Sequence, residues 1–238
     1  MKKFLLICLC ILISLPAFGF SVREFLYPTY TTQNWASIVL DKLKWIYLIK
    51  PTRRELMFNS RGTSARALGQ EHWTGAIIIN AWYFWRDSAG YFPAGHFSLD
   101  PAIVDKSWCE RDLNLCGYIS TDSLHIQEHL TFTKEPTLAA WPVLMLDGKV
   151  NKDVQNKTSH RTQKRTRTVL IETKKWPVFL IAKKQYRLDW ILAYSVKYFG
   201  RDISVINLDG GSSTSIRTDN SVFQFNATKT LPTFFILK

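Results

Sequence analysis

Apolar residues in this chain gather in short segments, and only one longer segment has the spacing of an amphipathic helix. Three consecutive isoleucines in GAIIINAWYF, residues 75–84, predict a buried strand, and the polar WRDSAGYFPAGH that follows predicts an exposed loop. Residues 188–199 place apolar side chains on one helical face, and Gly200 supplies a C-terminal stop. Strands dominate with few helices between them, which predicts an α+β fold.

Other segments are predicted from the same kind of pattern. Strands are expected at 35–40, 45–49, 124–133, 166–171, 178–182, 203–208 and 233–237, although the spacing of the first two also fits a helix. WPVLMLDGK runs into Asp147 and Gly148, a pair that closes hairpins. The polar stretch 151–165 has no periodicity and predicts a long surface loop.

The N-terminus has the organisation of a secretory signal, Met1 to Gly19. Lys2 and Lys3 precede the apolar run FLLICLCILISL, and small residues surround a cleavage point after Gly19. Residues 20–238 are then expected to form a single folded domain. The product would be secreted or periplasmic, with no stable membrane anchor after removal of the signal.

Cysteine usage fits an exported protein. Cys8 and Cys10 lie in the predicted signal, which leaves Cys109 and Cys116 in WCERDLNLC. In an oxidising compartment such a pair can close a small disulfide loop, and the alternative is two reduced, part-buried thiols.

Positive charge is concentrated in one part of the sequence. The formal net charge is +12, and residues 149–187 hold twelve lysine and arginine residues against Asp153 and Glu172, a local charge of +10. Such a segment attracts phosphates, acidic polysaccharide, a membrane surface or nucleic acid, and it also fits a solvated face of a basic protein. Nucleic acid is not predicted as a partner, because no recognition module is legible.

The stretch INLDGGSSTSI, residues 206–216, takes an apolar strand into an acidic residue, two glycines and several hydroxyl residues. Gly210 and Gly211 allow the backbone to turn successive N–H groups toward one point, and the hydroxyls add donors. Such a concavity suits an anion, with Asp209 beside it to meet a sugar or a cation. From local chemistry alone, a hairpin turn that satisfies its own backbone is the alternative.

Residues 207–214, NLDGGSST, resemble the hallmark of the phosphodiester glycosidases, an apolar strand running into N-L-D-G-G-(G)-S-S-T near the C-terminus. Further residues occur in that family's order: Asn80, Tyr83, Phe84, Pro93 and Gly95, then Leu144 and Gly148, then Arg167 and Thr168. The resemblance spans roughly residues 75–237. It implies one domain of twisted, mostly antiparallel sheets, and a hydrolase that cleaves a sugar-1-phosphodiester linkage in a glycan or glycoconjugate.

The resemblance and the chemistry of that bond together assign roles. Cleavage at the anomeric carbon develops positive charge on the sugar and negative charge on the phosphate. Asp209 is the expected carboxylate near the sugar, Arg167 the phosphate clamp, and Asn80 a ligand of a sugar hydroxyl or a support for Asp209. The predicted substrate-binding residues are Asn207, Gly210, Gly211, Ser212, Ser213 and Thr214. No metal ligand or cofactor is predicted, and the sequence leaves open whether a divalent cation helps Asp209 to hold phosphate.

Each role has a plainer alternative. Arg167 also fits a solvated cation, and Asn80 a cap at a strand end. Asp87 and Asp147 are second candidate carboxylates, the latter more typical of a turn residue.

The sequence also departs from the family pattern. Ala81 and Trp82 stand where the family has two glycines, and IAKKQYRLDWIL, residues 181–192, lacks the D-G-R turn and the S-x-G pair. These departures favour a different class of function, a non-catalytic module of the same fold that binds phosphorylated or anionic glycan through residues 149–187.

A third hypothesis rests on HIQEH, residues 125–129, which matches the H-x-x-E-H pattern of inverted zinc peptidases. In a helix, His125 and His129 would share one face and bind zinc, with Glu128 as the base. The alternating apolar residues predict a strand instead, and no third ligand follows at a recognisable spacing.

Overall fold

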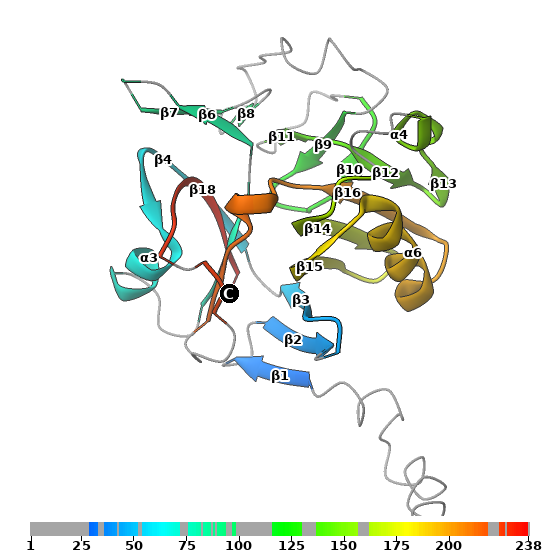
Figure 1. Ribbon diagram of the computed structural model, residues 1–238, viewed down its shortest axis with the longest axis horizontal. Coiled ribbons are helices and arrows are strands. Elements are labelled where there is room, and N and C mark those ends of the chain that lie inside the picture. Colours follow the sequence, from blue (N-terminus) through cyan, green and yellow to red (C-terminus); the bar gives the residue numbers. More distant parts are fainter. Residues whose placement is uncertain are drawn as a thin grey trace, which may run out of the picture.

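Figure 1 shows the computed structural model of the chain, in which strands gather into several sheets with few helices between them. The structure describes residues 29–32, 36–41, 43–51, 54–71, 76–81, 83–86, 88, 90–93, 97–98, 116–129, 137–156, 162–218, 224–226 and 228–237. The predicted signal peptide, Trp82, Asp87, Gly95 and Cys109 lie outside the described residues.

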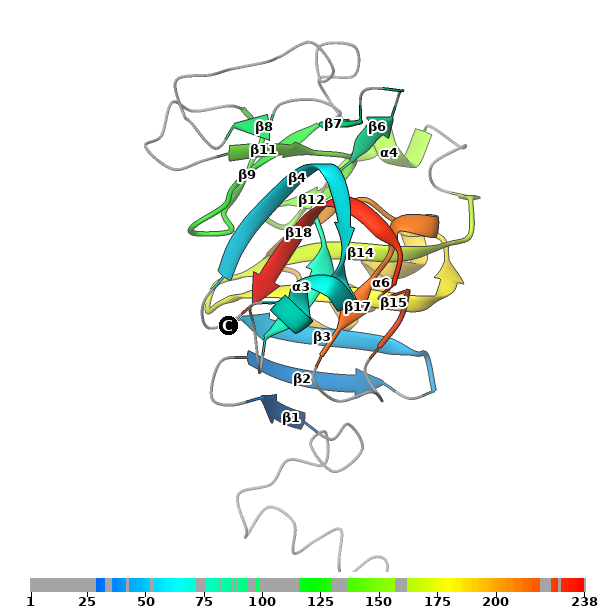
Figure 2. The same ribbon diagram turned by 90° about the vertical axis from the view of Figure 1, so that its left-hand side faces the viewer.

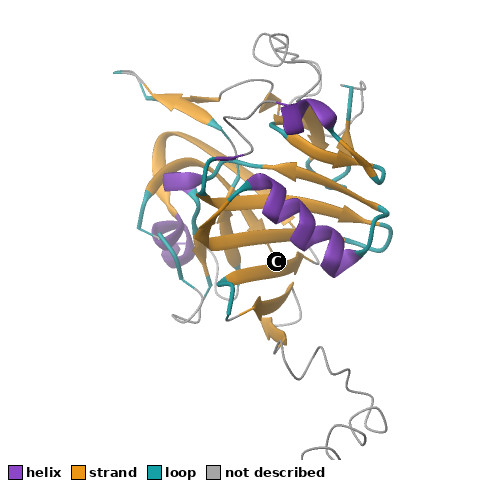
Figure 3. Ribbon diagram, turned by 45° about the vertical axis from the view of Figure 1, so that its right-hand side comes forward, coloured by secondary structure: helices purple, strands orange, loops and turns teal. Residues whose placement is uncertain are grey.

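An eight-stranded antiparallel sheet forms the centre of the fold. Its strands in spatial order are β1 (Thr29–Thr32), β2 (Ala36–Asp41), β3 (Ile46–Pro51), β15 (Pro177–Tyr186), β14 (Arg165–Thr173), β16 (Ile203–Asn207), β12 (Val143–Leu146) and β13 (Lys149–Val150). Helix α6 (Leu188–Phe199) connects β15 to β16 and crosses one face of this sheet, as Figure 3 shows.

Two smaller sheets and a hairpin complete the described strands. One sheet has the order β10 (Ile126–Gln127), β9 (Gly117–Ser120), β11 (Thr137–Ala140) and β8 (Phe97–Ser98). The other has the order β17 (Ile216–Arg217), β5 (Ile77–Asn80), β18 (Thr230–Leu237) and β4 (Arg54–Ser64). The hairpin pairs β6 (Phe84–Arg86) with β7 (Tyr91–Pro93), and the short helices are α3 (Ala65–Glu71), α4 (Lys152–Asn156) and the 3-10 helix η3 (Gly211–Ser213). The predicted α+β fold of mostly antiparallel sheets is confirmed.

Alternation of side chains along the central strands gives the large sheet two apolar faces. On β14, Val169 and Ile171 belong to the core that includes Ile191 of α6. Leu170, between them, belongs to the core that includes Phe235 of β18. The strand that precedes the 208–215 loop, β16, is paired with β14 and buried along its length, so the loop leaves from a well-packed position.

Two turn predictions are confirmed. Asp147 and Gly148 connect β12 to β13 with φ of 45° and 79°, the left-handed pair of a type I′ hairpin turn. Gly200 ends α6 with φ of 89°, and its N–H donates to the Val196 carbonyl oxygen. Asp147 is therefore accounted for as a turn residue.

Several segments differ from the sequence prediction. Residues 75–84 do not form one strand, because β5 ends at Asn80 and β6 begins at Phe84 in another sheet. The predicted loop after Phe84 contains the β6–β7 hairpin, and the predicted loop at 151–165 contains α4. Val154 explains the second difference, because this one aliphatic residue of a polar stretch is buried in the α6 core and anchors a helical turn.

Within the described ranges, no helix is long and apolar enough to cross a membrane. Cys116 is buried and disulfide-bonded, as predicted for one member of the pair.

The basic segment 149–187 does not form one patch. Lys174 and Lys175 lie at the β14–β15 turn, whereas Arg165 and Lys184 lie at the other end of the same two strands. A nine-residue strand is about 30 Å long, so the hairpin separates the two groups of charge.

Candidate functional site

The candidate site is built on the loop that leaves β16 and enters η3. Its central support is Asn80 at the end of β5, whose side chain is buried. The Asn80 Nδ2 donates to the Asp209 carbonyl oxygen at 2.6 Å. The Asn80 Oδ1 accepts from the Ser215 N–H at 2.9 Å and from the Thr168 hydroxyl at 2.7 Å. One buried amide therefore ties both ends of the loop to β5 and β14.

Asn207 and Tyr83 fix the start of the loop. Asn207 Nδ2 donates to the Tyr83 hydroxyl and, at 2.8 Å, to the Leu208 carbonyl oxygen. The Tyr83 hydroxyl lies 2.6 Å from the Trp141 carbonyl oxygen and 2.8 Å from that of Leu208. Burial, and secondarily the Asp209 carboxylate, raises the pKa of Tyr83 well above its ordinary value, so the hydroxyl stays protonated and acts as a donor.

Strand β14 packs directly against the loop. The Thr166 hydroxyl donates to the Gly211 carbonyl oxygen. A Cβ atom on Gly210 would lie 3.0 Å from the Thr166 carbonyl oxygen and 3.8 Å from Arg167 Cδ. The missing side chain at Gly210 therefore lets the loop lie directly on β14, above Arg167.

Arg167 is a buried cation, with 7% of its surface exposed. Its guanidinium donates to the carbonyl oxygens of Gln163, at 2.8 Å, and Tyr186, at 3.3 Å. The described residues provide it with no carboxylate ion pair. Burial lowers the pKa of Arg167, and the nearby charge of Arg165 acts in the same direction. A buried guanidinium that lacks a carboxylate partner favours binding of an anion.

The Asp209 carboxylate is only partly exposed. It accepts hydrogen bonds from the Ser213 side chain and the Gly210 N–H, and Lys229 lies near it. Desolvation outweighs these three contributions and raises the pKa of Asp209 to about 6. The group can therefore exchange a proton close to neutral pH, as a general acid or base requires.

Two residues that precede β18 donate hydrogen bonds to carbonyl oxygens of the loop. Lys229 Nζ donates to the Ser212 carbonyl oxygen, and Asn226 Nδ2 donates to that of Thr214 at 3.0 Å. Sequence reasoning missed Lys229 and Asn226, because no motif links either residue to the loop.

Gly211 has φ of 61°, a conformation that side chains disfavour. Gly211→Ala is expected to lower the free energy of unfolding by about 1 kcal/mol, because alanine resists this conformation. The new Cβ would also lie 3.4 Å from Arg165 Nη1. Urea unfolding measures the change. Gly200→Ala measures backbone strain alone and should also be destabilised, since Gly200 has positive φ but an added Cβ would have no atom within 4 Å. A Gly211→Ala protein as stable as the parent would show that the loop conformation is not constraining.

The predicted site residues differ in what their side chains contact. Asp209 and Arg167 are charged groups beside the loop, as is Lys229, and Asn80 holds the Asp209 backbone rather than its carboxylate. Asn207 likewise uses its amide nitrogen on the protein. Of the predicted hydroxyl residues, Ser212 is exposed, whereas Ser213 and Thr214 are buried.

The histidine hypothesis is not supported by local structure. His125 precedes β10 and His129 follows it, so the two rings do not share a helical face. His125 Nδ1 lies 2.7 Å from the Glu172 carboxylate. In the part of the chain that the structure describes, no three His, Cys, Asp or Glu residues are arranged to hold a metal ion.

Comparison with known proteins finds similarity in structure alone. No family model and no curated protein sequence matches the chain. The catalytic domain of zebrafish N-acetylglucosamine-1-phosphodiester alpha-N-acetylglucosaminidase, auto-inhibited by its pro-peptide, aligns with a TM-score of 0.57 and 13% identity, over 93% of this chain and 90% of that one. The fold resembles a phosphodiester glycosidase domain. A hypothetical protein from Synechocystis aligns with a TM-score of 0.50 and 10% identity, over 89% of this chain and 61% of that one.

One departure from the phosphodiester glycosidase pattern has a structural account. Ala81, where that family has a glycine, is fully buried in the core that includes Phe235. Its N–H donates to the Thr233 carbonyl oxygen at 3.2 Å. The added methyl group therefore packs into the core.

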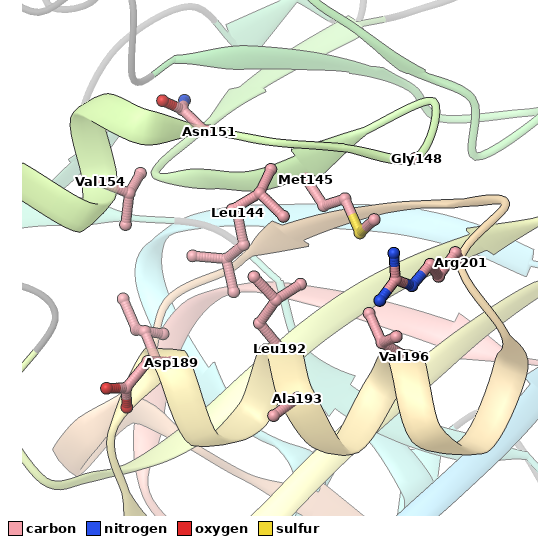
Figure 4. A pocket seen from close by; sticks show the side chains of 12 residues that line it. Leu144, Met145, Gly148, Asn151, Val154, Asp189, Leu192, Ala193, Val196 and Arg201 are labelled. Carbon is pink, nitrogen blue, oxygen red and sulfur yellow. The ribbon is translucent and has the colours of Figure 1, made fainter.

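A separate apolar pocket of about 360 Å³ lies between α6, β12 and α4. Figure 4 shows Leu144, Leu192 and Val154 among its lining side chains. None of the predicted site residues is among the described residues that line this pocket.

Proposed function

We propose that the chain hydrolyses a sugar-1-phosphodiester linkage, with Asp209 facing the sugar and Arg167 holding the phosphate. The observation that carries this proposal is the position of one loop, which bears the desolvated Asp209 carboxylate and lies through Gly210 against Arg167. Among the described residues, the buried Arg167 guanidinium has no carboxylate partner. The fold supports it, because the similar zebrafish domain is named for hydrolysis of this kind of bond.

In the proposed reaction, water attacks the anomeric carbon and the bond from that carbon to the phosphate oxygen breaks. The phosphate leaves with the electron pair, and Asp209 accepts the proton of the attacking water. The phosphate is a good leaving group and needs little protonation, so one carboxylate suffices. Arg167 stabilises the charge on the departing phosphate, because a guanidinium can hold two oxygens at once.

The same residues support a positioning role for Asn80. Its amide holds the Asp209 carbonyl oxygen, so the rotation of the peptide that carries the carboxylate is restricted. Preorganised groups avoid reorganisation during the reaction, which favours the transition state. Asn80 therefore acts through Asp209 and does not need to contact substrate.

The pH dependence follows from the raised pKa of Asp209, about 6. As a base, Asp209 must be ionised, and its ionised fraction rises from about one tenth at pH 5 to about nine tenths at pH 7. We expect kcat/KM to rise about tenfold over this range. A rate that falls over the same range would assign Asp209 the role of an acid instead.

The direct test is release of free sugar from an N-acetylglucosamine-1-phosphodiester by the purified protein. Asp209→Asn is expected to lower turnover by a factor of about 10² to 10⁴, and Asp147→Asn, a matched change at an exposed turn, to retain it. Turnover by Asp209→Asn at the rate of the parent would contradict the proposal. If no phosphorylated sugar is cleaved by the folded parent protein, while salt-sensitive glycan binding persists, the non-catalytic module is the better account.

A further inference from the structure

The turn between β2 and β3 exposes two large apolar side chains. Leu43 is 85% exposed and Trp45 is 47% exposed, the two highest values among the described large apolar residues. They lie two positions apart at the tip of a hairpin, next to the buried residues Ile46 and Tyr47. The exposed apolar residues of this tip thus directly adjoin the buried apolar residues of β3.

The backbone at Trp45 adds a second observation. Its φ is 54°, in the left-handed region that bulky side chains rarely adopt. Glycine or asparagine would suit this backbone conformation better than tryptophan. An unfavourable backbone conformation that holds an aromatic ring at the surface points to a role in binding.

Cationic side chains surround the same tip. Lys183 is half-buried, donates to the Gln224 carbonyl oxygen and lies 5.2 Å from the centre of the Trp45 ring. Lys184 is exposed, and its Nζ lies 3.5 Å from the Leu43 carbonyl oxygen. Lys44 belongs to the turn and pairs with Asp41 at 2.8 Å. Three lysines against one aspartate leave this tip with an excess of positive charge.

The tip shares one end of the large sheet with the candidate site. Register places Ile46 of β3 opposite Ala182, and Ala182 opposite Arg167 of β14. Figure 2 shows the β2–β3 turn and η3 toward the same side of the molecule. Three strand spacings separate β3 from β16, or about 14 Å.

We propose that the β2–β3 tip, residues 43–45 with Lys183 and Lys184, docks reversibly on an anionic lipid surface. Tryptophan and leucine enter the headgroup region of a bilayer, and lysines beside them bind acidic headgroups. An acidic polysaccharide would satisfy the lysines but would leave the Leu43 side chain without an apolar environment. The combination therefore favours lipid over a soluble polyanion.

This inference does not depend on hydrolysis. If the candidate site is catalytic, docking brings it close to the membrane, where a lipid-linked sugar phosphate is the accessible class of substrate. Binding to lipid is measured without substrate, so failure of one proposal leaves the other intact.

The test is sedimentation with phosphatidylglycerol–phosphatidylcholine vesicles. The protein used in this test starts at Phe20, so that it lacks the apolar N-terminal run and keeps every described residue. The double variant Leu43→Ser with Trp45→Asn is expected to bind at least about tenfold more weakly, because both apolar contacts are lost. Asparagine tolerates the left-handed conformation, so a thermal melt should show an unimpaired fold.

Trp176→Ser is the matched control. Trp176 is 39% exposed at the opposite end of the sheet, with Lys50 Nζ 3.6 Å from its ring centre, so it offers the same chemistry in another place. We expect Trp176→Ser and Asp209→Asn to bind vesicles like the parent.

Three results would overturn the proposal: no vesicle binding by the parent protein, equal binding by the double variant, or a loss in Trp176→Ser as large as in the double variant. Dextran sulfate is added as a competitor of vesicle binding. If it competes equally well with the parent protein and the double variant, the positive charge binds acidic polysaccharide instead of lipid.

Discussion

Replacing Asp209 with asparagine is expected to stabilise the protein at neutral pH while lowering kcat by a factor of about 10² to 10⁴. Burial raises the pKa of Asp209 from 3.8 to about 6, so the ionised carboxylate opposes folding by about 3 kcal/mol above pH 6. Asparagine carries no charge and keeps an oxygen for the Ser213 hydroxyl. Removal of the buried charge therefore raises the free energy of unfolding.

The free energy of unfolding of the parent protein should change with pH in one direction. Between pH 4 and 6 the folded parent binds more protons than the unfolded chain, so its stability falls as the pH rises. Parent and variant should unfold alike near pH 3.5 and diverge by about 2–3 kcal/mol by pH 7.5. Urea titrations at both pH values measure the difference. A variant that is less stable than the parent at pH 7.5 would contradict a desolvated carboxylate.

The second large effect is expected from Asn80→Leu, which should lower the free energy of unfolding by about 3–6 kcal/mol. The substitution leaves the Asp209 carbonyl oxygen, the Ser215 N–H and the Thr168 hydroxyl without their partner. Each unsatisfied buried group costs about 1–3 kcal/mol. Hydrolysis should also be lost, because the carboxylate is no longer held.

Thr168→Val is the matched control for Asn80→Leu. It removes one of the three hydrogen bonds and leaves the other two in place, so a loss of about 1–2 kcal/mol is expected. Chemical unfolding of both proteins at one pH gives the comparison. If the two substitutions destabilise equally, the amide of Asn80 does not organise the loop.

Local patterns were sufficient for part of the fold. Helix α6, its stop at Gly200 and the turn at Asp147 and Gly148 follow from periodicity and turn chemistry within a few residues. The strands around Val169 and Leu180 follow from apolar runs between polar ends. These elements are determined by residues that are close in sequence, so one sequence is enough to predict them.

Other parts depend on partners that are distant in sequence. The eleven-residue strand β4 was not predicted, and it is a strand because it pairs along most of its length with β18. The predicted strand at 75–84 is divided between two sheets, because β5 pairs with β17 and β18, whereas β6 pairs with β7. Within the site, the 207–214 motif identified Asp209, whereas Lys229 and Asn226 contact the loop only through the folded chain.

The hydrogen bonds that hold the loop have a consequence for how the protein folds. Asn80 and Asp209 are separated by 129 positions, Tyr83 and Leu208 by 125, and Asn80 and Thr168 by 88. Contacts this distant in sequence form slowly, because a large part of the chain must be ordered before they close. The charged groups of the loop should thus reach their places only after the β5 and β14 sheets have met, and recovery of activity during refolding would lag behind the formation of secondary structure.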